Sequence, residues 1–318
     1  MEFCHVPVML EECMQGLKLR QDGVYFDGTL GGAGHSGEIL KRTSPSGRLI
    51  ATDLDPEAIA NAEKKLAPFS GRFRLFHANY KNFSSVAEDA GIEGFDGALL
   101  DLGVSSYQLD NRERGFSYMA TDSRLDMRMD PGQRKSAWEV VNTYDRKKLS
   151  YILAIYGEEK FAENIAKNIV EERKFRTIDT TGQLCGIVDR SIPYKFKQGG
   201  HPAKKTFQAI RIEVNEELDG LGECLRDIVK GLKPGGRIAV MTFHSLEDRI
   251  VKQTFQDLAT ACVCDKRLPV CVCGRKKKVE LVNKKPIVAD EEECLSNPRA
   301  KSAKLRIAEK IRLFDGEK

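Results

Sequence analysis

The stretch GVYFDGTLGGAGHSGEIL, residues 23–40, decides the fold. Its apolar run ends in Asp27 and indicates a buried strand, while Ile39 and Leu40 begin the apolar face of a helix. The loop between strand and helix carries Gly28, Gly31, Gly32 and Gly34. Glycine has no Cβ and tolerates positive φ, so such a loop lets backbone amides approach a ligand at a helix N-terminus. The stretch predicts a cofactor loop, with a plain tight turn as the alternative.

A second strand that ends in an acid follows this loop. Residues 48–52 form another apolar run, and Asp53 comes directly after it. A carboxylate at this place accepts hydrogen bonds from ribose hydroxyls in nucleoside-binding folds. Asp55 precedes Pro56, which suits a helix N-cap followed by the first helical residue. We therefore predict that Asp53 contacts the ligand and that Asp55 is structural.

Strand, glycine loop, helix, strand and acid together predict half of a Rossmann-like nucleoside site. Two cofactor families use such a site: the nicotinamide or flavin dinucleotides, and S-adenosylmethionine. The loop has the pattern D-G-T-x-G-G-A-G-H, which differs from the G-x-G-x-x-G of dinucleotide enzymes. The pattern alone leaves the choice of cofactor open.

Two later strands carry side chains suited to a site at their carboxyl ends. Tyr80 follows the third strand, residues 73–76, and is predicted either to lie near an adenine or to anchor its loop. Asp101 ends the fourth strand, residues 95–101, and opens a serine-containing loop. A methyltransferase presents its acceptor nucleophile at such a place. The alternative is a carboxylate that caps the strand.

His244 follows the fifth predicted strand, residues 237–243. Ser245 and Asp248 fit a capping box, which places His244 on the turn into a helix, facing the cleft. A histidine there either orients a base or relays a proton. The alternative is a histidine that only hydrogen-bonds its loop.

The alternation of strands and helices stops between residues 107 and 205. We predict an α/β fold with a discontinuous sheet domain, residues 1–106 and 206–318, and an inserted helical domain, residues 107–205. The insert contains a basic loop with Arg112, Arg114, Arg124, Arg128, Arg134 and Lys135, and it ends in IPYKFKQGGHPAKK, residues 192–205. Lysines interleaved with aromatic rings suit single-stranded nucleic acid, and a solvated loop is the alternative.

The composition is that of a globular protein, with 41% hydrophobic and 31% charged residues. No run of eighteen apolar residues and no secretion signal are present, so we expect a cytoplasmic protein without a membrane partner. The net charge of +4 does not by itself indicate a polyanion partner.

Nine cysteines in a cytoplasmic chain are expected to be mostly reduced. Two C-x-C pairs raise the question of zinc: Cys262 with Cys264, and Cys271 with Cys273. Most structural zinc ligands are spaced two to four residues apart, and C-x-C is a tight bite. The sequence therefore favours a mobile or hairpin segment of reduced thiols without a metal, and a zinc site is the alternative.

Motifs along nearly the whole chain carry a family resemblance: DGTLGGAGHS at 27–36, ATDLDP at 51–56, LLDLGVSSYQLD at 99–110, RGFSY at 114–118, LDMRMD at 125–130, HPAKKTFQAIRIEVNEEL at 201–218, LKPGGRIAVMTFHSLEDRIVK at 232–252 and NPRAKSAKLRIAEK at 297–310. They closely resemble the bacterial RsmH family, also called MraW, which are 16S ribosomal RNA cytosine-N4 methyltransferases. The resemblance implies a class I, Rossmann-like methyltransferase domain with S-adenosyl-L-methionine as cofactor. It also implies 16S rRNA in the small ribosomal subunit, and no DNA, as the partner.

The resemblance also assigns roles to residues of the site. It implies that the loop Ala33, Gly34 and His35 contacts the methionine part of the cofactor and that Asp53 contacts the ribose. It places Tyr80 beside the adenine, with Asp101 and Gln108 completing the pocket. Family members commonly carry phenylalanine at the position of Tyr80, so the ring is kept.

The catalytic residue is the least determined part of the site. The D-P-P-Y tetrad of amino-methylating enzymes is absent, and Asp101 begins D-L-G-V instead. We therefore take Asp101 alone as the candidate acceptor for the N–H bonds of the target amine. A nicotinamide oxidoreductase and a non-catalytic RNA-binding or assembly factor are the two alternatives from other classes.

Overall fold

The computed structural model describes residues 7–197, 200–265 and 270–311. The chain forms two compact units. The first unit comprises residues 1–103 and 220–318, and the second comprises residues 104–219. Among the described residues, no helix combines the length and the apolar character that crossing a bilayer requires.

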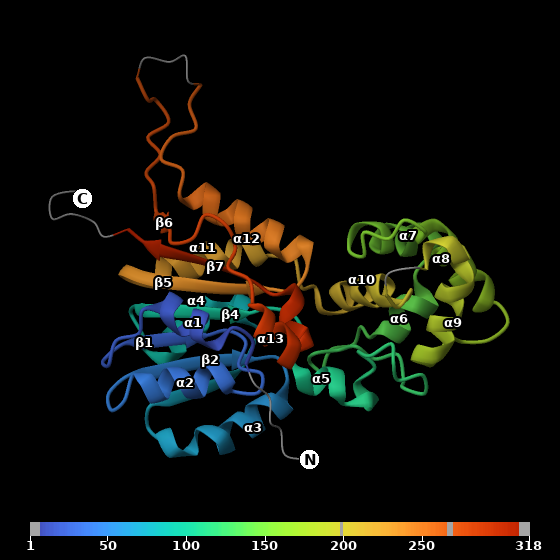
Figure 1. Ribbon diagram of the computed structural model, residues 1–318, viewed down its shortest axis with the longest axis horizontal. Coiled ribbons are helices and arrows are strands. Elements are labelled where there is room, and N and C mark those ends of the chain that lie inside the picture. The colour runs from blue at the N-terminus through green and yellow to red at the C-terminus, as the bar shows by residue number, and fades with distance from the viewer. Residues whose placement is uncertain (1–6, 198–199, 266–269, 312–318) are drawn as a thin grey trace. The chain divides into compact units, whose positions relative to one another are not determined.

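The first unit is built on a seven-stranded sheet with the strand order β3-β2-β1-β4-β5-β7-β6 (Figure 1). β1 to β5 run parallel, whereas β7 lies antiparallel between β5 and β6. The strands are β1 (Val24–Asp27), β2 (Arg48–Asp53), β3 (Phe73–His77), β4 (Phe95–Asp101), β5 (Leu232–Thr242), β6 (Val279–Leu281) and β7 (Lys304–Lys310). The strand order reverses at β1 and β4, where open parallel sheets bind ligands.

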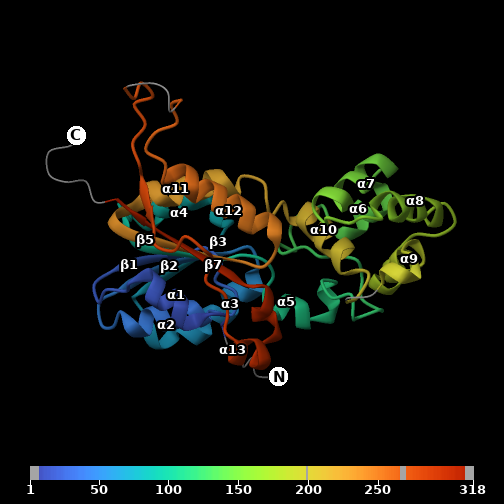
Figure 2. The same ribbon diagram turned by 45° about the horizontal axis from the view of Figure 1, so that its top comes forward.

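Helices cover both faces of this sheet, as Figures 1 and 2 show. One face carries α1 (Leu10–Leu17), α2 (Gly34–Arg42) and α3 (Pro56–Leu66), and the other carries α4 (Phe83–Ala90), α11 (Leu221–Gly231) and α12 (Ser245–Leu258). Short helical segments complete the unit: η1 (Ala67–Phe69), η2 (Tyr80–Asn82), α13 (Glu291–Ser296) and η5 (Pro298–Ser302). The predicted α/β, Rossmann-like fold is confirmed.

The central strands contain apolar runs, such as residues 24–26 of β1 and 97–100 of β4, because both of their faces are buried. In β4, Ala98 and Leu100 pack with α4, α11 and α12, whereas Leu99 packs with α1, α2 and α3. In β1, Phe26 likewise packs on the face of α4, α11 and α12, and Tyr25 packs on the opposite face. Successive side chains of a strand point to opposite faces of the sheet. A strand that helices cover on both faces therefore has consecutive apolar residues.

The second unit is helical in its described part, with α5 (Ser106–Asp110), η3 (Arg112–Arg114), α6 (Ala137–Thr143), α7 (Arg146–Ile155), α8 (Ala162–Glu172), α9 (Thr181–Ser191), η4 (Tyr194–Phe196) and α10 (Lys204–Asn215). Its limits differ from the predicted insert, residues 107–205, because α10 belongs to it. Phe207, Ile210 and Val214 of α10 join one core with α6, α7, α8 and α9. The apolar face of a helix indicates that the helix is partly buried, but it does not indicate in which domain. Residues 198–199 of the predicted nucleic-acid segment lie outside the described residues.

Candidate active site

The glycine loop of the first unit is fixed by Asp27, the last residue of β1. Its Oδ2 accepts a hydrogen bond from Ser36 Oγ at 2.6 Å, and its Oδ1 accepts one from the Thr29 amide at 3.0 Å. Burial raises the pKa of Asp27, and these two hydrogen bonds oppose that rise. One buried carboxyl thus ties the start of the loop to the first turn of α2. Sequence reasoning used Asp27 only as a strand end, although an acid and a serine flanking a glycine loop signal such a tie.

Gly28 lies where no side chain fits. A Cβ built on it would stand 2.3 Å from Leu100 Cδ2 and 2.8 Å from Tyr80 Cβ. The Gly28 amide donates to Leu99 O at 2.9 Å, and Thr52 Oγ1 donates to Gly28 O at 3.0 Å. The backbone of the loop is therefore held against the tips of β2 and β4, with Tyr80 directly beside it.

The loop continues through left-handed backbone into α2. Gly31 and Ala33 have φ values of 47° and 58°, and α2 begins at Gly34. The N-cap residue Ala33 offers no side-chain oxygen to the first turn of the helix. Such a helix start presents amide dipoles toward whatever occupies the loop. This is the geometry expected of a loop that takes a ligand rather than of a plain turn.

Replacing Gly28 tests this packing. We expect Gly28→Ala to destabilise the protein by about 1–3 kcal/mol, because the added methyl overpacks a closed contact. It should also weaken cofactor binding, because the loop backbone has to move. Gly37→Ala is the matched control: it lies on α2, and its nearest neighbour would be Leu66 Cδ2 at 3.7 Å. Thermal melting and calorimetry of both variants check this, and equal behaviour would contradict it.

Asp53 ends β2 and holds the far side of the loop. Its Oδ2 accepts from the Gly31 amide at 2.7 Å, and its Oδ1 accepts from the Asp55 amide at 2.8 Å. Burial raises the pKa of Asp53 to about 6, against the lowering effect of the two amides. The side chain is partly exposed, and each carboxylate oxygen has a second acceptor direction. Asp53 can therefore accept ribose hydroxyls while it orders the loop.

Asp55 has the structural role predicted for it. Its side chain caps α3 by accepting from the Glu57 amide at 3.1 Å, with Pro56 as the first helical residue. Tyr80 opens η2 after β3, next to Gly28, and is half-buried. Its contact with an adenine stays a prediction.

Asp101 ends β4 next to the same loop. Its amide donates to Thr29 Oγ1 at 2.6 Å, and its Oδ2 lies 3.7 Å from His35 Nδ1. His35 is buried, and its Nε2 lies 3.1 Å from Val8 O. Burial, helped by the nearby carboxyl groups of Asp27 and Glu247, raises the pKa of Asp101 to about 8. The pKa of Asp101 is thus raised further than that of Asp53, and Asp101 lies at the strand tip where the sequence predicts chemistry.

The predicted capping box of Ser245 and Asp248 is wrong. The N-cap of α12 is His244, which forms a capping box with Glu247. Glu247 is buried, its Oε2 accepts from the Phe243 amide at 2.9 Å, and its Oε1 lies 3.1 Å from His244 Nε2. Asp248 is turned toward β7, where its Oδ1 accepts from Arg306 Nε at 2.6 Å. Both acids stand near the start of the helix, so spacing alone does not choose between them.

Gln108 belongs to the second unit, whereas the other predicted site residues belong to the first. Its amide donates to Ser105 Oγ at 3.2 Å, and its Oε1 accepts from the Ser105 amide at 3.1 Å, so it caps α5. The structure thus brings Ala33, Gly34, His35, Asp53, Tyr80 and Asp101 together around the glycine loop. The ligand contacts of these residues, and those of Gln108, stay predictions.

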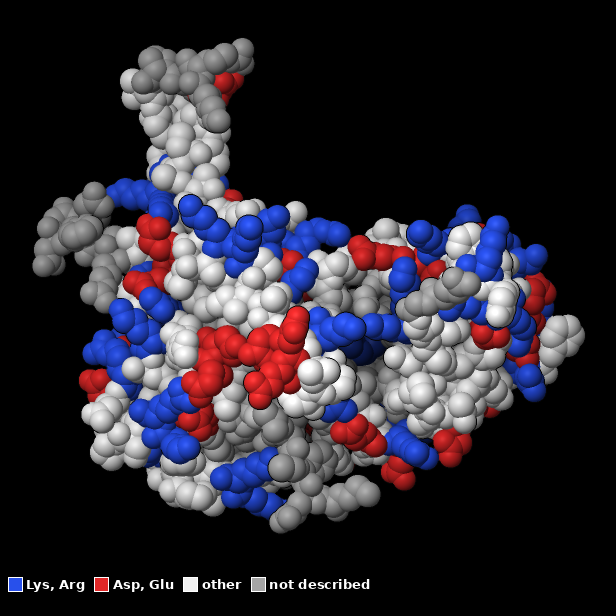
Figure 3. Space-filling model, viewed as in Figure 1, with Lys and Arg blue, Asp and Glu red and all other residues white. Residues whose placement is uncertain are grey.

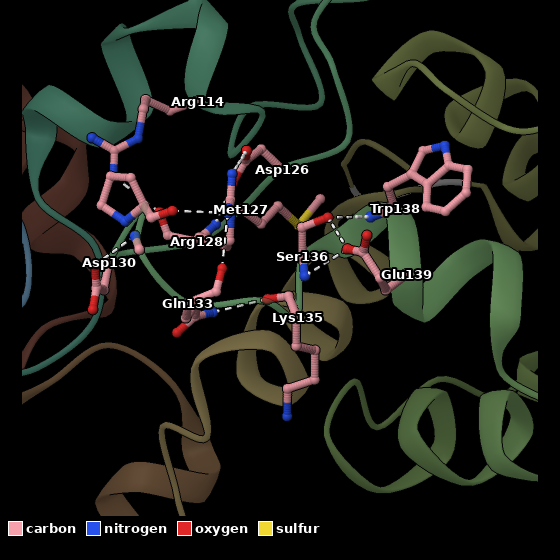
Figure 4. Close-up of polar contacts among 12 residues, drawn as sticks. Arg114, Asp126, Met127, Arg128, Asp130, Gln133, Lys135, Ser136, Trp138 and Glu139 are labelled. Carbon is pink, nitrogen blue, oxygen red and sulfur yellow. Dashed lines mark hydrogen bonds and ion pairs between the residues drawn. The ribbon is translucent and has the colours of Figure 1, made fainter.

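Part of the predicted basic loop is used to fold the second unit, as Figure 4 shows. The Arg128 guanidinium pairs with the Asp126 carboxylate at 2.7 Å and donates to the carbonyls of Pro131 and Gln133 at 2.8 Å. Arg114 donates to Arg128 O at 2.9 Å. These two arginines therefore have a structural role in ordering this loop. The exposed arginines of this loop are Arg112, Arg124 and Arg134.

Comparison with known proteins gives the family. The chain matches the model of the MraW methylase family over residues 2–311. It is 50% identical to "Ribosomal RNA small subunit methyltransferase H" of Clostridioides difficile, over 98% of this chain and 100% of that protein. It is 51% identical to "Ribosomal RNA small subunit methyltransferase H 2" of Agathobacter rectalis, over 98% of this chain and 99% of that protein. The resemblance found in the motifs is confirmed: the chain belongs to the MraW methylase family.

Proposed function

We propose that this chain methylates the N4 amine of a specific cytidine in the decoding region of 16S rRNA, on the small ribosomal subunit. It is an S-adenosyl-L-methionine-dependent methyltransferase, as its family membership shows. The relatives' names specify small-subunit ribosomal RNA. The observation that carries the proposal is the partly buried carboxyl of Asp101 at the end of β4, beside the glycine loop.

The residues of the first unit fit the cofactor. Gly28 has no room for a Cβ, which keeps the loop backbone close to the strand tips. Asp53 has acceptor directions left for ribose hydroxyls. The loop from Ala33 to His35 begins α2 and suits the methionine part. When bound, S-adenosylmethionine supplies an activated methyl group on a sulfonium.

The amine of cytosine is a poor nucleophile because its lone pair is delocalised into the ring. Attack requires the nitrogen to pyramidalise, and an acceptor for its N–H bonds favours that change. Asp101 is the acceptor in this proposal, and its ionised form does the accepting. The positive charge of a bound sulfonium would favour the ionised carboxylate of Asp101. It would therefore lower the pKa of Asp101, which is about 8 in the ligand-free chain.

Recognition of RNA falls to the second unit in this proposal. The target base has to leave its stack, and exposed basic side chains hold the flanking phosphates. On the face seen in Figure 3, basic and acidic side chains are mixed, in keeping with a net charge of +4. A few specific contacts and the shape of the RNA therefore contribute more to RNA recognition than an extended basic surface does.

Exchanging the exposed arginines tests this assignment. The triple variant Arg112→Ala, Arg124→Ala and Arg134→Ala should weaken binding to small subunits by roughly tenfold and reduce the salt slope by about 2, since each phosphate contact contributes about 0.7–0.9. A charge-matched control replaces three exposed lysines of the second unit outside this loop, Lys147, Lys160 and Lys167. Binding measured over a salt series decides. Equal losses in the two variants would refute a specific role for the loop.

The reaction itself is tested with undermethylated small subunits and labelled S-adenosylmethionine, followed by nucleoside analysis of the RNA. We expect label in N4-methylcytidine at one position. Label in another nucleoside would refute the target. Bound cofactor without any incorporation would support the RNA-binding alternative. Protection against melting by NADH instead of S-adenosylmethionine would support an oxidoreductase.

A further inference from the structure

An arm whose described residues are 259–265 and 270–278 projects from the first unit between α12 and β6 (Figures 1 and 2). Its neck is closed by hydrogen bonds. The Lys278 amide donates to Leu258 O at 2.8 Å, and Arg275 Nε donates to Thr260 O at 3.1 Å. The Arg275 guanidinium also pairs with Asp257 of α12 at 2.5 Å. Both ends of the arm are thus anchored to the same helix end.

The arm has no apolar core among its described residues. Val263, Val270 and Val272 are 60%, 69% and 75% exposed. The first buried residue after Leu258 in the described sequence is Val279, in β6. Among the residues of the arm that the structure describes, burial of apolar surface therefore does not hold the two sides together. Small segments of this kind are stabilised by covalent or metal cross-links.

A cluster of four free thiols lies in this arm: Cys262, Cys264, Cys271 and Cys273. All four sulfur atoms lie within 4.8 Å of one another. Four of the Sγ–Sγ distances are 3.4 Å for Cys262–Cys271, 3.5 Å for Cys271–Cys273, 3.9 Å for Cys264–Cys271 and 3.9 Å for Cys262–Cys273. Four thiolates around zinc at about 2.3 Å form a tetrahedron with edges of about 3.8 Å. The cluster has the size of that tetrahedron.

We propose that this cluster binds one structural Zn²⁺. Four soft thiolates in a tetrahedral arrangement favour zinc and leave no open position for a substrate. The tight C-x-C bite, which argues against zinc from the sequence, spans only one edge of the tetrahedron. For Cys271 and Cys273 that edge is 3.5 Å. Because each side of the arm contributes one pair, the metal joins the two sides.

The surroundings of the sulfur atoms suit thiolates. The Cys264 amide donates to Cys262 Sγ, and the Val272 amide donates to Cys264 Sγ, both at 3.4 Å. Such amide hydrogen bonds orient and stabilise metal-bound sulfur. Four thiolates and one Zn²⁺ carry a net charge of −2, and the basic run of residues 275–278 begins two residues after Cys273. Binding releases the protons of the thiols that were protonated.

Metal analysis of the full-length chain, purified without a metal-affinity step, tests the proposal. We expect about one zinc per chain. The double variant Cys264→Ser and Cys271→Ser should lose the zinc, whereas Cys294→Ser should keep it. Cys294 is a half-buried thiol of α13, outside the cluster. Chains without zinc, or with zinc retained by the double variant, would overturn the assignment, as would iron or copper in its place.

A second measurement uses the wild-type chain and does not depend on how the variants fold. Zinc is removed with a chelator, and Co²⁺ is titrated in as a coloured probe. We expect sulfur-to-cobalt charge-transfer bands that saturate at one Co²⁺ per chain and disappear when Zn²⁺ is added. Protease cleavage within the arm should become faster in the metal-free chain. Absence of these bands would contradict coordination by four thiolates.

Discussion

Asp101→Asn is expected to slow methyl transfer to small subunits by about 10²-fold, the size typical of losing one group that assists proton movement in the transition state. Asparagine keeps the shape of the side chain but cannot supply an ionised acceptor for the amine. Cofactor affinity should change by a smaller factor. Single-turnover methylation, compared with calorimetric binding of the cofactor, separates the two effects. Asp89→Asn, an exposed acid of α4, is the control.

The pH dependence of the wild type follows from the same carboxyl. Its pKa of about 8 means that the ionised acceptor becomes more abundant as the pH rises through 8. We therefore expect kcat/KM to increase from pH 7 to pH 9 in the wild type and to stay flat in Asp101→Asn. A wild-type rate in the variant would remove Asp101 as the amine acceptor.

The stability of the ligand-free protein should change in the opposite direction. An unfolded aspartate ionises near pH 3.9, whereas folded Asp101 does so near pH 8, so folding takes up a proton between these values. The stability that Asp101 contributes is present below about pH 4 and is lost as the pH rises through 8. Asp101→Asn should therefore raise the melting temperature at pH 8.5 by several degrees. A lower melting temperature would contradict the burial of this carboxyl.

Asp53→Ala is expected to weaken S-adenosylmethionine binding by about 2 kcal/mol, roughly thirtyfold, since hydrogen bonds to a charged group contribute about 1.5–3 kcal/mol. The variant loses the ribose acceptor and also leaves the Gly31 amide without the carboxylate that orders it. Calorimetry of the isolated chain measures this. In the wild type, affinity should fall as the pH drops through about 6, where Asp53 becomes protonated.

Asp55→Asn is the matched control for this prediction. It lies two residues away and keeps a good N-cap for α3, because asparagine caps as well as aspartate. We expect its cofactor affinity to match the wild type within a factor of about two. An equal loss in both variants would trace the effect to the fold of the loop and would retire the ribose contact.

The strands and the glycine loop could be predicted from the sequence because their signals are local. The run before Asp27 and the run before Asp53 are apolar because strands covered on both faces need no polar residues. The left-handed backbone at Gly31 is likewise a property of its own residue type. Asp55 and Pro56 mark the start of α3 in two adjacent letters.

Features that depend on distant neighbours could not be predicted in this way. The apolar face of α10 does not tell which unit buries it. His244, and not Ser245, is the N-cap of α12, because Glu247 accepts from the Phe243 amide while Asp248 pairs with Arg306. The two C-x-C pairs are separated by six residues in the sequence, and only folding brings their sulfur atoms together.

The central claim is that the methyl donor binds at the carboxyl edge of the sheet, between Asp53 and Asp101. A crystal structure of the full-length protein with S-adenosylmethionine tests it most directly. We predict ribose hydroxyls on Asp53, the adenine next to Tyr80 and the methionine part along Ala33 to His35. Donor density elsewhere on the molecule, with this edge of the sheet empty, would contradict the account.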